Sequence, residues 1–321
     1  MAVFTSLQRS VLGMLSPSGR NARLIILMFH QVLERKDPVF PDVPDGRFFD
    51  KQMSWLAEYC NVIPLYEAAL RLQDGTLPSR AACITFDDGY ADNLEIAAPI
   101  LSKHRLPATF FITGGAVEEG IMWNDLVIEA MRRGTGETDL RDLELGMFDL
   151  SSDAARRAAI DQVLAKLKYQ ELAERQSVAE RIHSLITGSA PPRLMMTVDQ
   201  VEEIANKGFE VGAHTINHPI LKNLEADVAR AEICLSRDWV HDVTGRVPMS
   251  FAYPNGRPGV DYDESHEVMG RDAGFGVAVS TRWSCANAPD SLFGLPRISA
   301  GESSRNAYWL RLAKTTVKSY F

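Results

Sequence analysis

Cysteine is scarce in this sequence, with only four among 321 residues and no Cys-x-x-Cys pair. Thiolate zinc sites and disulfide frameworks both need cysteines at short, regular spacing, so neither is indicated here. Cys83 falls within an apolar run, and we expect it to be a small buried hydrophobic residue. This cysteine usage favours a reducing, cytoplasmic setting.

Long hydrophobic runs and an excess of basic charge are also missing. No run approaches the roughly 20 apolar residues that a membrane-spanning helix needs, so we expect no transmembrane segment. Asp and Glu number 42 against 34 Lys and Arg, for a net charge of −8, which argues against a nucleic-acid partner. Nothing in the sequence indicates an oligomeric state.

The N-terminal stretch lacks a clean hydrophobic core. Its apolar residues are interrupted by Gln8, Arg9 and Ser10, so it makes a poor signal peptide. We expect residues 1–21 to be a leader or an amphipathic helix that can rest on a membrane or a partner. The expected location is the cytoplasm, with peripheral contact to the inner face of the membrane as an option.

The rest of the chain alternates between short apolar runs and helical patterns. The apolar runs cover 23–29, 62–63, 81–84, 108–112, 209–213, 249–253 and 276–280, with a last short run around 297–298. Seven or eight such strands separated by helices predict a parallel α/β architecture, and their number favours a barrel over an open sheet. We expect this barrel to occupy residues 22–321.

One long segment departs from this alternation. Between about residues 117 and 192, helical patterns dominate, charges are dense and runs of β-branched residues are absent. We interpret the segment as a helical insertion in the barrel and not as a separate domain.

Two adjacent carboxylates, Asp87 and Asp88, stand directly after a buried run and before Gly89. Two like charges this close repel each other, and a bound cation would relieve the repulsion. Taken alone, the same residues are also typical of a polar turn that caps the next helix.

A histidine pair gives the second signal. His214 ends an apolar run and His218 follows four residues later, so a helical turn there would bring both rings to one face. Two imidazoles and one carboxylate, supplied by Asp87 or Asp88, form a metal site with open positions for water. Either signal alone is also explained by a polar junction; together they predict a metal centre.

The remaining parts of the pattern favour amide hydrolysis. A divalent ion makes its water more acidic and polarises a carbonyl, and the second carboxylate can accept the water proton. A protonated histidine can then deliver a proton to an amine leaving group. His30, at the end of an apolar run, is the candidate acid; a buried structural histidine is the alternative.

With both motifs in view, the sequence resembles the polysaccharide deacetylases, the NodB-homology group of carbohydrate esterase family four. The resemblance rests on Thr85-Phe86-Asp87-Asp88-Gly89 and His214-Thr215-Ile216-Asn217-His218, and it covers about residues 23–298. It implies a distorted (β/α) barrel and metal-dependent removal of acetyl groups from N-acetylated sugars. It further implies that Asp87 is the catalytic base and that Asp88, His214 and His218 bind the metal. Zn²⁺ is the expected ion, with Co²⁺ and Ni²⁺ as alternatives.

The sequence departs from the family pattern at two places. Where the family has Arg-x-Pro-aromatic-Gly, this chain has Ala252-Tyr253-Pro254-Asn255-Gly256. The Asn255 N–H can still bind an oxyanion, with Tyr253 beside it, whereas the arginine that steadies the catalytic carboxylate is absent. Arg297, at another strand end, is our candidate for that charge. The late Leu-x-His motif is also missing, and an early Phe29-His30, as in some exopolysaccharide deacetylases, favours His30 as the acid.

Trp123, near the start of the insertion, can stack on a sugar ring or can simply pack the insertion.

The main hypothesis is a metal-dependent sugar N-deacetylase in exopolysaccharide or capsule metabolism. The alternatives are hydrolysis of another C–N amide, such as a cyclic ureide, an imide or peptidoglycan, and a non-catalytic glycan- or metal-binding relic. A cytoplasmic enzyme would act on a sugar precursor or a lipid-linked intermediate.

Overall fold

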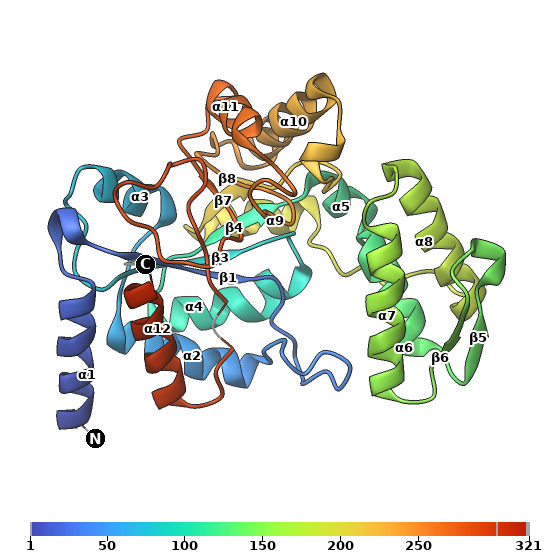
Figure 1. The fold of residues 1–321 in the computed structure, drawn as a ribbon, viewed down its shortest axis with the longest axis horizontal. Coiled ribbons are helices and arrows are strands. Elements are labelled where there is room, and N and C mark those ends of the chain that lie inside the picture. The colour runs from blue at the N-terminus through green and yellow to red at the C-terminus, as the bar shows by residue number, and fades with distance from the viewer. Residues whose placement is uncertain (1, 300, 319–321) are drawn as a thin grey trace.

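Seven parallel strands form one curled sheet at the centre of the computed structural model, which describes residues 2–299 and 301–318 (Figure 1). The strands are β1 (Leu24–Phe29), β2 (Asn61–Val62), β3 (Ala81–Phe86), β4 (Thr109–Ile112), β7 (Glu210–Ala213), β8 (Ser250–Ala252) and β9 (Val277–Val279). Their order is β1-β3-β4-β7-β8-β9, and the short β2 pairs with the start of β3. The predicted parallel α/β architecture is therefore confirmed.

The ring is completed by an irregular segment between β9 and β1. Leu295 bridges to β9 and Ile298 bridges to β1, both in the parallel sense. The Ser280 N–H donates to the Leu295 carbonyl at 2.8 Å, and the Met28 N–H donates to the Ile298 carbonyl at 2.9 Å. Arg297 lies between these two bridging residues, so the segment that closes the barrel also carries a buried arginine.

Helices lie around the outside of this barrel (Figure 1). They are α2 (Gly46–Tyr59), α3 (Leu65–Gln73), α4 (Ala98–His104), α9 (Val198–Asn206), α10 (Ala226–Thr244) and α11 (Glu264–Asp272). Local sequence sets several of their ends. Thr197 and Gln200 form a capping box at the start of α9, and the Asp45 carboxylate accepts from the Phe48 N–H to begin α2.

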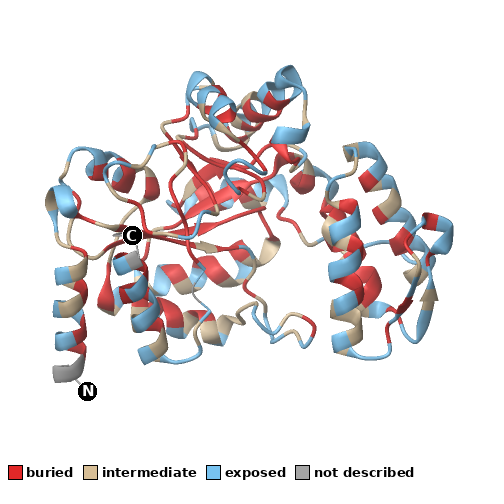
Figure 2. Cartoon of the chain, viewed as in Figure 1, coloured by how far each residue is buried: buried red, intermediate tan, exposed pale blue. Residues whose placement is uncertain are grey.

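Tightly packed aromatic rings hold the strand end that carries the two carboxylates. Phe86, the last residue of β3, is fully buried between Phe29 and Phe110, with ring centroids 5.4 and 4.8 Å away. Burying one such side chain stabilises the fold by about 1.5–3 kcal/mol. Figure 2 shows that buried residues run along the strands throughout the sheet. Asp87 and Asp88 therefore directly follow a tightly packed strand end, which fixes the position of their backbone.

The segment between β4 and α9 contains a β-hairpin as well as helices. It comprises α5 (Gly114–Glu119), α6 (Trp123–Arg133), β5 (Glu137–Asp139), β6 (Met147–Asp149), α7 (Asp153–Leu167) and α8 (Leu172–Thr187). The hairpin is not among the elements expected from the sequence. The two strands are only three residues each and pair antiparallel, so they leave no hydrophobic run in the sequence.

The insertion has a hydrophobic core of its own, separate from that of the barrel. Val39, from the loop that follows β1, is buried in that second core. The Arg157 guanidinium lies 4.5 Å from the centroid of the neighbouring Phe40 ring, and Arg132 forms an ion pair with Asp37. The insertion is thus attached to the loop that begins at His30.

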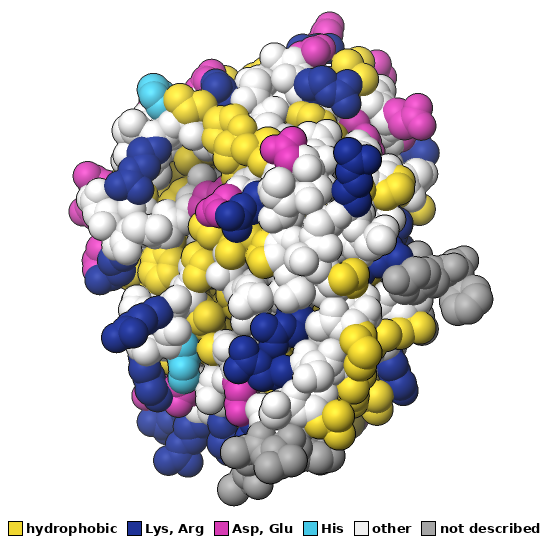
Figure 3. Space-filling model, turned by 90° about the vertical axis from the view of Figure 1, so that its left-hand side faces the viewer, with side chains coloured by type: hydrophobic (Ala, Val, Ile, Leu, Met, Phe, Trp, Pro, Cys, Tyr) yellow, Lys and Arg dark blue, Asp and Glu magenta, His cyan; other side chains and the backbone are white. Residues whose placement is uncertain are grey.

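The terminal helices α1 (Ala2–Leu15) and α12 (Arg305–Lys318) pack against each other and against α2. On α1, Leu12 is fully buried whereas Leu7 and Met14 are 60% and 72% exposed. Figure 3 views the molecule from this side and shows hydrophobic side chains among lysines and arginines. Within the described residues, no helix is both long and apolar enough to cross a bilayer. Contact of α1 with a membrane stays a prediction.

Candidate active site

An open cleft of about 1360 Å³ lies at the carboxyl ends of the strands, between the barrel and the insertion. Most of the side chains selected from the sequence meet there, as expected for the active face of a parallel barrel, whereas Tyr253 and Arg297 do not line the cleft. The cleft is lined by His30, Asp87, Asp88, His214, His218 and Asn255 from strand ends, and by Trp123, Lys168 and Arg175 from the insertion.

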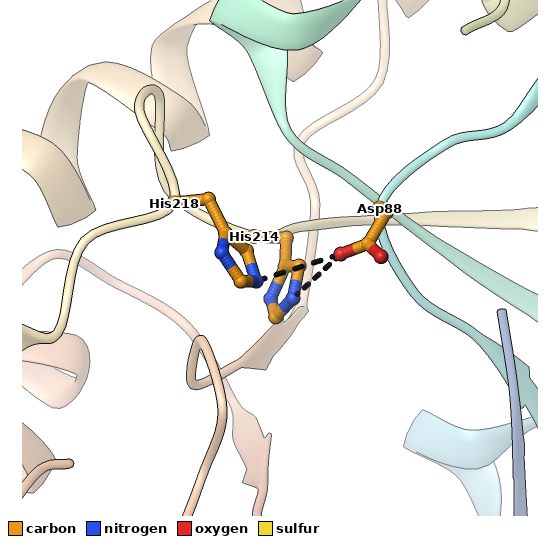
Figure 4. Close-up of side chains that lie close together, drawn as sticks. All are labelled: Asp88, His214 and His218. Atoms are coloured by element: carbon orange, nitrogen blue, oxygen red, sulfur yellow. Dashed lines mark ion pairs between the residues drawn. The ribbon is translucent and has the colours of Figure 1, made fainter. Parts of the chain in front are cut away.

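Asp88, His214 and His218 form the one cluster among the described residues whose ligand atoms can share a metal ion (Figure 4). Their ligand atoms all lie within 4.8 Å of one another. Oδ1 of Asp88 is 3.4 Å from Nε2 of His214 and 3.5 Å from Nε2 of His218. That oxygen is buried and accepts no hydrogen bond within the described chain, which is a costly arrangement unless a cation satisfies it. These residues fit a divalent metal with open positions.

Unusual backbone conformations bring the three ligands together. Asp88 and Gly89 have φ angles of 76° and 92°, and Thr215 and His218 have φ angles of 65° and 49°. Left-handed conformations at non-glycine residues store strain and cluster at functional sites. A sharp bend, and not a helical turn, brings the two histidines together, because the left-handed Thr215 and His218 prevent a helix.

Two residues that could not be identified from the sequence, Glu232 and Gly115, hold this bend in place. The Glu232 carboxylate, on α10 and 6% exposed, accepts from the Ile216 and Asn217 N–H groups at 2.9 and 3.0 Å. The Gly115 N–H donates to the Ile216 carbonyl at 2.9 Å, and a Cβ at Gly115 would lie only 2.7 Å from that oxygen. A helix residue 16 positions away and a glycine after β4 carry no local signal of this role.

Hydrogen bonding fixes the orientation of His214. Its Nδ1 lies 2.7 Å from the backbone carbonyl of Ala252, so Nδ1 carries the proton and Nε2 faces Asp88. Burial opposes a charge on His214, but the nearby Asp88 and Asp87 carboxylates outweigh it and raise the pKa of this histidine. Burial lowers the pKa of His218 to about 3, so His218 is neutral and free to ligate.

Asp87 is bound by Arg297 through two hydrogen bonds. Nη1 and Nη2 of Arg297 lie 2.6 and 2.7 Å from the two carboxylate oxygens. Arg297 is itself almost fully buried and also donates to the Ser280 carbonyl and the Thr85 hydroxyl. Burial alone would raise the pKa of Asp87, but the Arg297 charge outweighs it, so the pKa lies below its ordinary value. Arg297 does not line the cleft, so its contact is with Asp87 and not with a ligand there.

His30 is exposed, which argues against the alternative of a buried structural histidine. The buried part of β1 ends at Phe29, and the chain then opens into the cleft. The Asn93 amide donates to the His30 carbonyl at 2.8 Å, and the Asp92 carboxylate accepts from the Val32 N–H at 3.2 Å. These two residues, which follow Asp87 closely in sequence, hold the backbone of the His30 loop while the ring faces the cleft.

Asn255 and Tyr253 have different surroundings. Asn255 lines the cleft with φ of 59°, and the Thr281 hydroxyl holds its carbonyl at 2.7 Å. Its N–H makes no hydrogen bond within the described part of the chain.

Tyr253 was wrongly expected at the site. Its ring is buried against Tyr262 with centroids 3.7 Å apart, and its hydroxyl donates to the Phe293 carbonyl. Tyr253 is a core residue because its side chain points from the strand end into the barrel wall.

Trp123 lines the cleft but is only 9% exposed. The Arg175 guanidinium covers its ring at 4.6 Å from the centroid, and the rest of the ring packs into the insertion core. This environment fits the packing alternative for Trp123 better than sugar stacking. Arg175, on α8, is the charged cleft residue that the sequence analysis missed, because nothing in its helical segment distinguishes it from the surrounding charges.

A sequence profile of the family described as Polysaccharide deacetylase matches residues 74–277, well over half of the chain. The chain belongs to the polysaccharide deacetylase family. The matched span contains Asp87, Asp88, His214 and His218, whereas His30 and Arg297 lie outside it.

Two relatives match most of this chain, and a third matches about a third of it. YxkH of Bacillus subtilis, whose name also assigns it to the polysaccharide deacetylases, is 21% identical over 86% of this chain and 71% of its own length. The poly-β-1,6-N-acetyl-D-glucosamine N-deacetylase of Staphylococcus aureus is 33% identical, over 32% of this chain and 36% of its own. The solved structure of the Streptococcus pyogenes deacetylase PplD in complex with acetate has a TM-score of 0.61 at 20% identity, over 92% of this chain and 98% of PplD. That likeness confirms the fold.

Proposed function

We propose that this polysaccharide deacetylase is a metal-dependent hydrolase that removes acetyl groups from the nitrogen of an N-acetylated saccharide. The observation that carries the proposal is the pairing of two centres in one cleft. Asp88, His214 and His218 provide a metal-ligand set, and the adjacent Asp87 is a carboxylate whose pKa Arg297 keeps low. The names of the relatives, which include an N-acetylglucosamine polymer deacetylase, agree with this chemistry.

Asp88, His214 and His218 would hold the metal, and their nitrogen and carboxylate donors suit Zn²⁺, with Co²⁺ and Ni²⁺ as alternatives. When bound, such an ion supplies a Lewis acid that polarises the acetamide carbonyl and makes water more acidic. The Asp87 carboxylate uses one acceptor position on each oxygen for Arg297. The remaining lone pairs are free to accept the proton of the attacking water.

The other side chains complete the reaction. The Asn255 N–H, which has no hydrogen-bond partner in the described chain, would donate to the oxygen on which negative charge develops. The His30 ring, exposed in the cleft, would deliver a proton to the departing amine. No residue needs to form a covalent adduct with the acetyl group. The relic alternative loses its main support, since Arg297 supplies a positive charge beside Asp87 although the family arginine is absent from the sequence.

Acetate release from N-acetylated saccharides tests this function. The protein, loaded in turn with Zn²⁺, Co²⁺ and Ni²⁺, is incubated with N-acetylglucosamine oligomers and with single N-acetylated sugars, and acetate and free amine are measured together. We expect both products in equal amounts. A metal-loaded protein that releases neither from any saccharide, but hydrolyses a cyclic ureide or imide, would contradict the proposal.

Replacing either histidine ligand with alanine should remove the metal. His214→Ala takes away a buried donor whose ring is already oriented by Ala252, and we expect zinc affinity to fall by more than the roughly 10- to 100-fold that loss of an outer-shell partner costs. Elemental analysis after dialysis measures the bound zinc. His241→Ala, on the exposed surface of α10, is the matched control and should keep the metal. Stoichiometric zinc in His214→Ala would remove that residue from the ligand set.

Replacing His30 with alanine should slow turnover without affecting metal binding. Loss of a general acid lowers kcat by about 100-fold or more. Acetate release measures the turnover, and elemental analysis of the same sample measures the bound zinc. His104→Ala is the control, because His104 pairs with Asp50 and lies outside the cleft. Turnover of zinc-loaded His30→Ala within about tenfold of wild type would assign the proton donor to another group.

A further inference from the structure

The side chain of Arg175 is buried in the cleft wall without an acidic partner. It is 5% exposed, and no carboxylate lies within ion-pair distance of it among the residues that the structure describes. Its Nη2 makes a long hydrogen bond of 3.4 Å to the Asn217 carbonyl, and its buried Nε makes none. A desolvated charge without a counter-charge is costly, so a position of this kind is typical of a ligand-binding group.

The surroundings of Arg175 leave its charge available to a ligand. Two of the carboxylates that line the cleft are already engaged: Asp87 is bound by Arg297, and Glu302 forms an ion pair with Arg311. Asp42 also lines the cleft; it is exposed and forms no ion pair with Arg175. Asp88 belongs to the metal-ligand set. The Trp123 ring fixes the plane of the Arg175 guanidinium from one side, at 4.6 Å from its centroid. This pre-organisation reduces the entropy that a bound group would cost.

A second cation of the insertion lies in the same cleft. Lys168, at the end of α7, lines the cleft and forms no ion pair within the described residues. Arg257 also lines it, but its guanidinium is bound to Asp261 and to the Tyr169 hydroxyl. The insertion side therefore presents two positive charges to the cleft although the whole chain carries a net charge of −8.

We propose that Arg175, assisted by Lys168, binds an anionic substituent of the saccharide substrate, either a carboxylate or a phosphate. The inference rests on the proposed function and narrows its substrate to an acidic N-acetylated saccharide. The Arg175 guanidinium contacts the carbonyl of Asn217, next to the metal ligand His218, so the anion would sit close to the sugar that is deacetylated. A planar guanidinium recognises both oxyanions with paired hydrogen bonds.

Three substrates separate these possibilities: the neutral disaccharide of N-acetylglucosamine, a disaccharide of N-acetylglucosamine and glucuronate, and N-acetylglucosamine 1-phosphate. We expect zinc-loaded wild-type protein to show a kcat/KM about 10- to 100-fold higher for one acidic substrate than for the neutral one, the effect of a charge-assisted hydrogen bond. In Arg175→Gln this ratio should fall toward one, mainly through KM, and in Lys168→Gln it should fall less. Whichever acidic substrate is preferred identifies the oxyanion.

Matched variants separate binding from structure. Arg181→Gln makes the same change on the exposed face of the same helix and should keep the full preference. Arg175→Lys keeps the charge and should retain part of it, even if Arg175→Gln folds poorly. Calorimetric titration of the metal-free protein with the two acidic compounds gives a second readout, and binding should weaken by a similar factor in Arg175→Gln.

The outcomes are distinguishable. If the kcat/KM of wild-type protein for the neutral disaccharide equals its kcat/KM for both acidic substrates, this inference is overturned and the proposed function is left intact. Wild-type protein that hydrolyses none of them overturns the proposed function. In that case the calorimetric titration still decides whether Arg175 binds an oxyanion, and equal affinities for wild type and Arg175→Gln would show that it does not.

Discussion

Asp87→Asn should lower kcat by about 10³-fold or more while zinc stays bound, since a general base in a positioned site contributes up to about 10⁴-fold. An amide cannot accept the proton of the attacking water, yet it has nearly the shape of the carboxylate. The ligand atoms of Asp88, His214 and His218 are untouched by the change. Turnover measured by acetate release and zinc measured by elemental analysis on the same sample test both halves of the prediction.

The change also leaves Arg297 buried without a full counter-charge, so a loss of folded protein must be separated from a loss of chemistry. Asp290→Asn is the control, because Asp290 is a half-buried carboxylate that is bound to Arg282 outside the cleft. We expect Asp290→Asn to keep wild-type kcat. If Asp87→Asn, folded and zinc-loaded, turned over within about tenfold of wild type, the base would be another group.

Much of the site could be predicted because a parallel barrel gathers strand ends at one edge. An apolar run that stops at a polar residue indicates both the strand and its end, and Asp87, Asp88, His214 and Asn255 each stand at such a point. Arg297 could be found in the same way, since the segment around it closes the ring between β9 and β1. Its contact with Asp87 joins residues 210 positions apart that share only this edge.

The other residues of the site could not be predicted, because their roles depend on tertiary contacts that leave no local pattern in the sequence. Glu232 holds the histidine bend from the middle of α10, and Arg175 reaches the cleft from one of several charged helices in the insertion. Both look like ordinary surface charges in the sequence. Tyr253 was misassigned for a related reason: being next to a site residue does not determine which way a side chain points, and this one turns into the core.

Arg297→Met should raise the pKa of Asp87 and shift the acid limb of the kcat/KM profile to higher pH. Without the guanidinium, burial is the main influence left on the carboxylate, and burial disfavours its charged form. Removing one partner of a buried ion pair also lowers the free energy of unfolding by about 3–5 kcal/mol. The lowered pKa of Asp87 determines how this loss of stability depends on pH. In the wild type, Asp87 stabilises the fold at pH values above the ordinary carboxylate pKa, and this contribution is lost as the pH falls through the lowered value.

The variant should therefore lose most stability near neutral pH and differ least from wild type in acid. Chemical unfolding at several pH values, together with the pH dependence of acetate release, measures both effects. Arg297→Lys keeps a charge but cannot make the two parallel hydrogen bonds, so its acid limb should lie between those of wild type and Arg297→Met. A purely structural role for Arg297 would lower stability in both variants and leave the acid limb of the folded enzyme where it is in wild type.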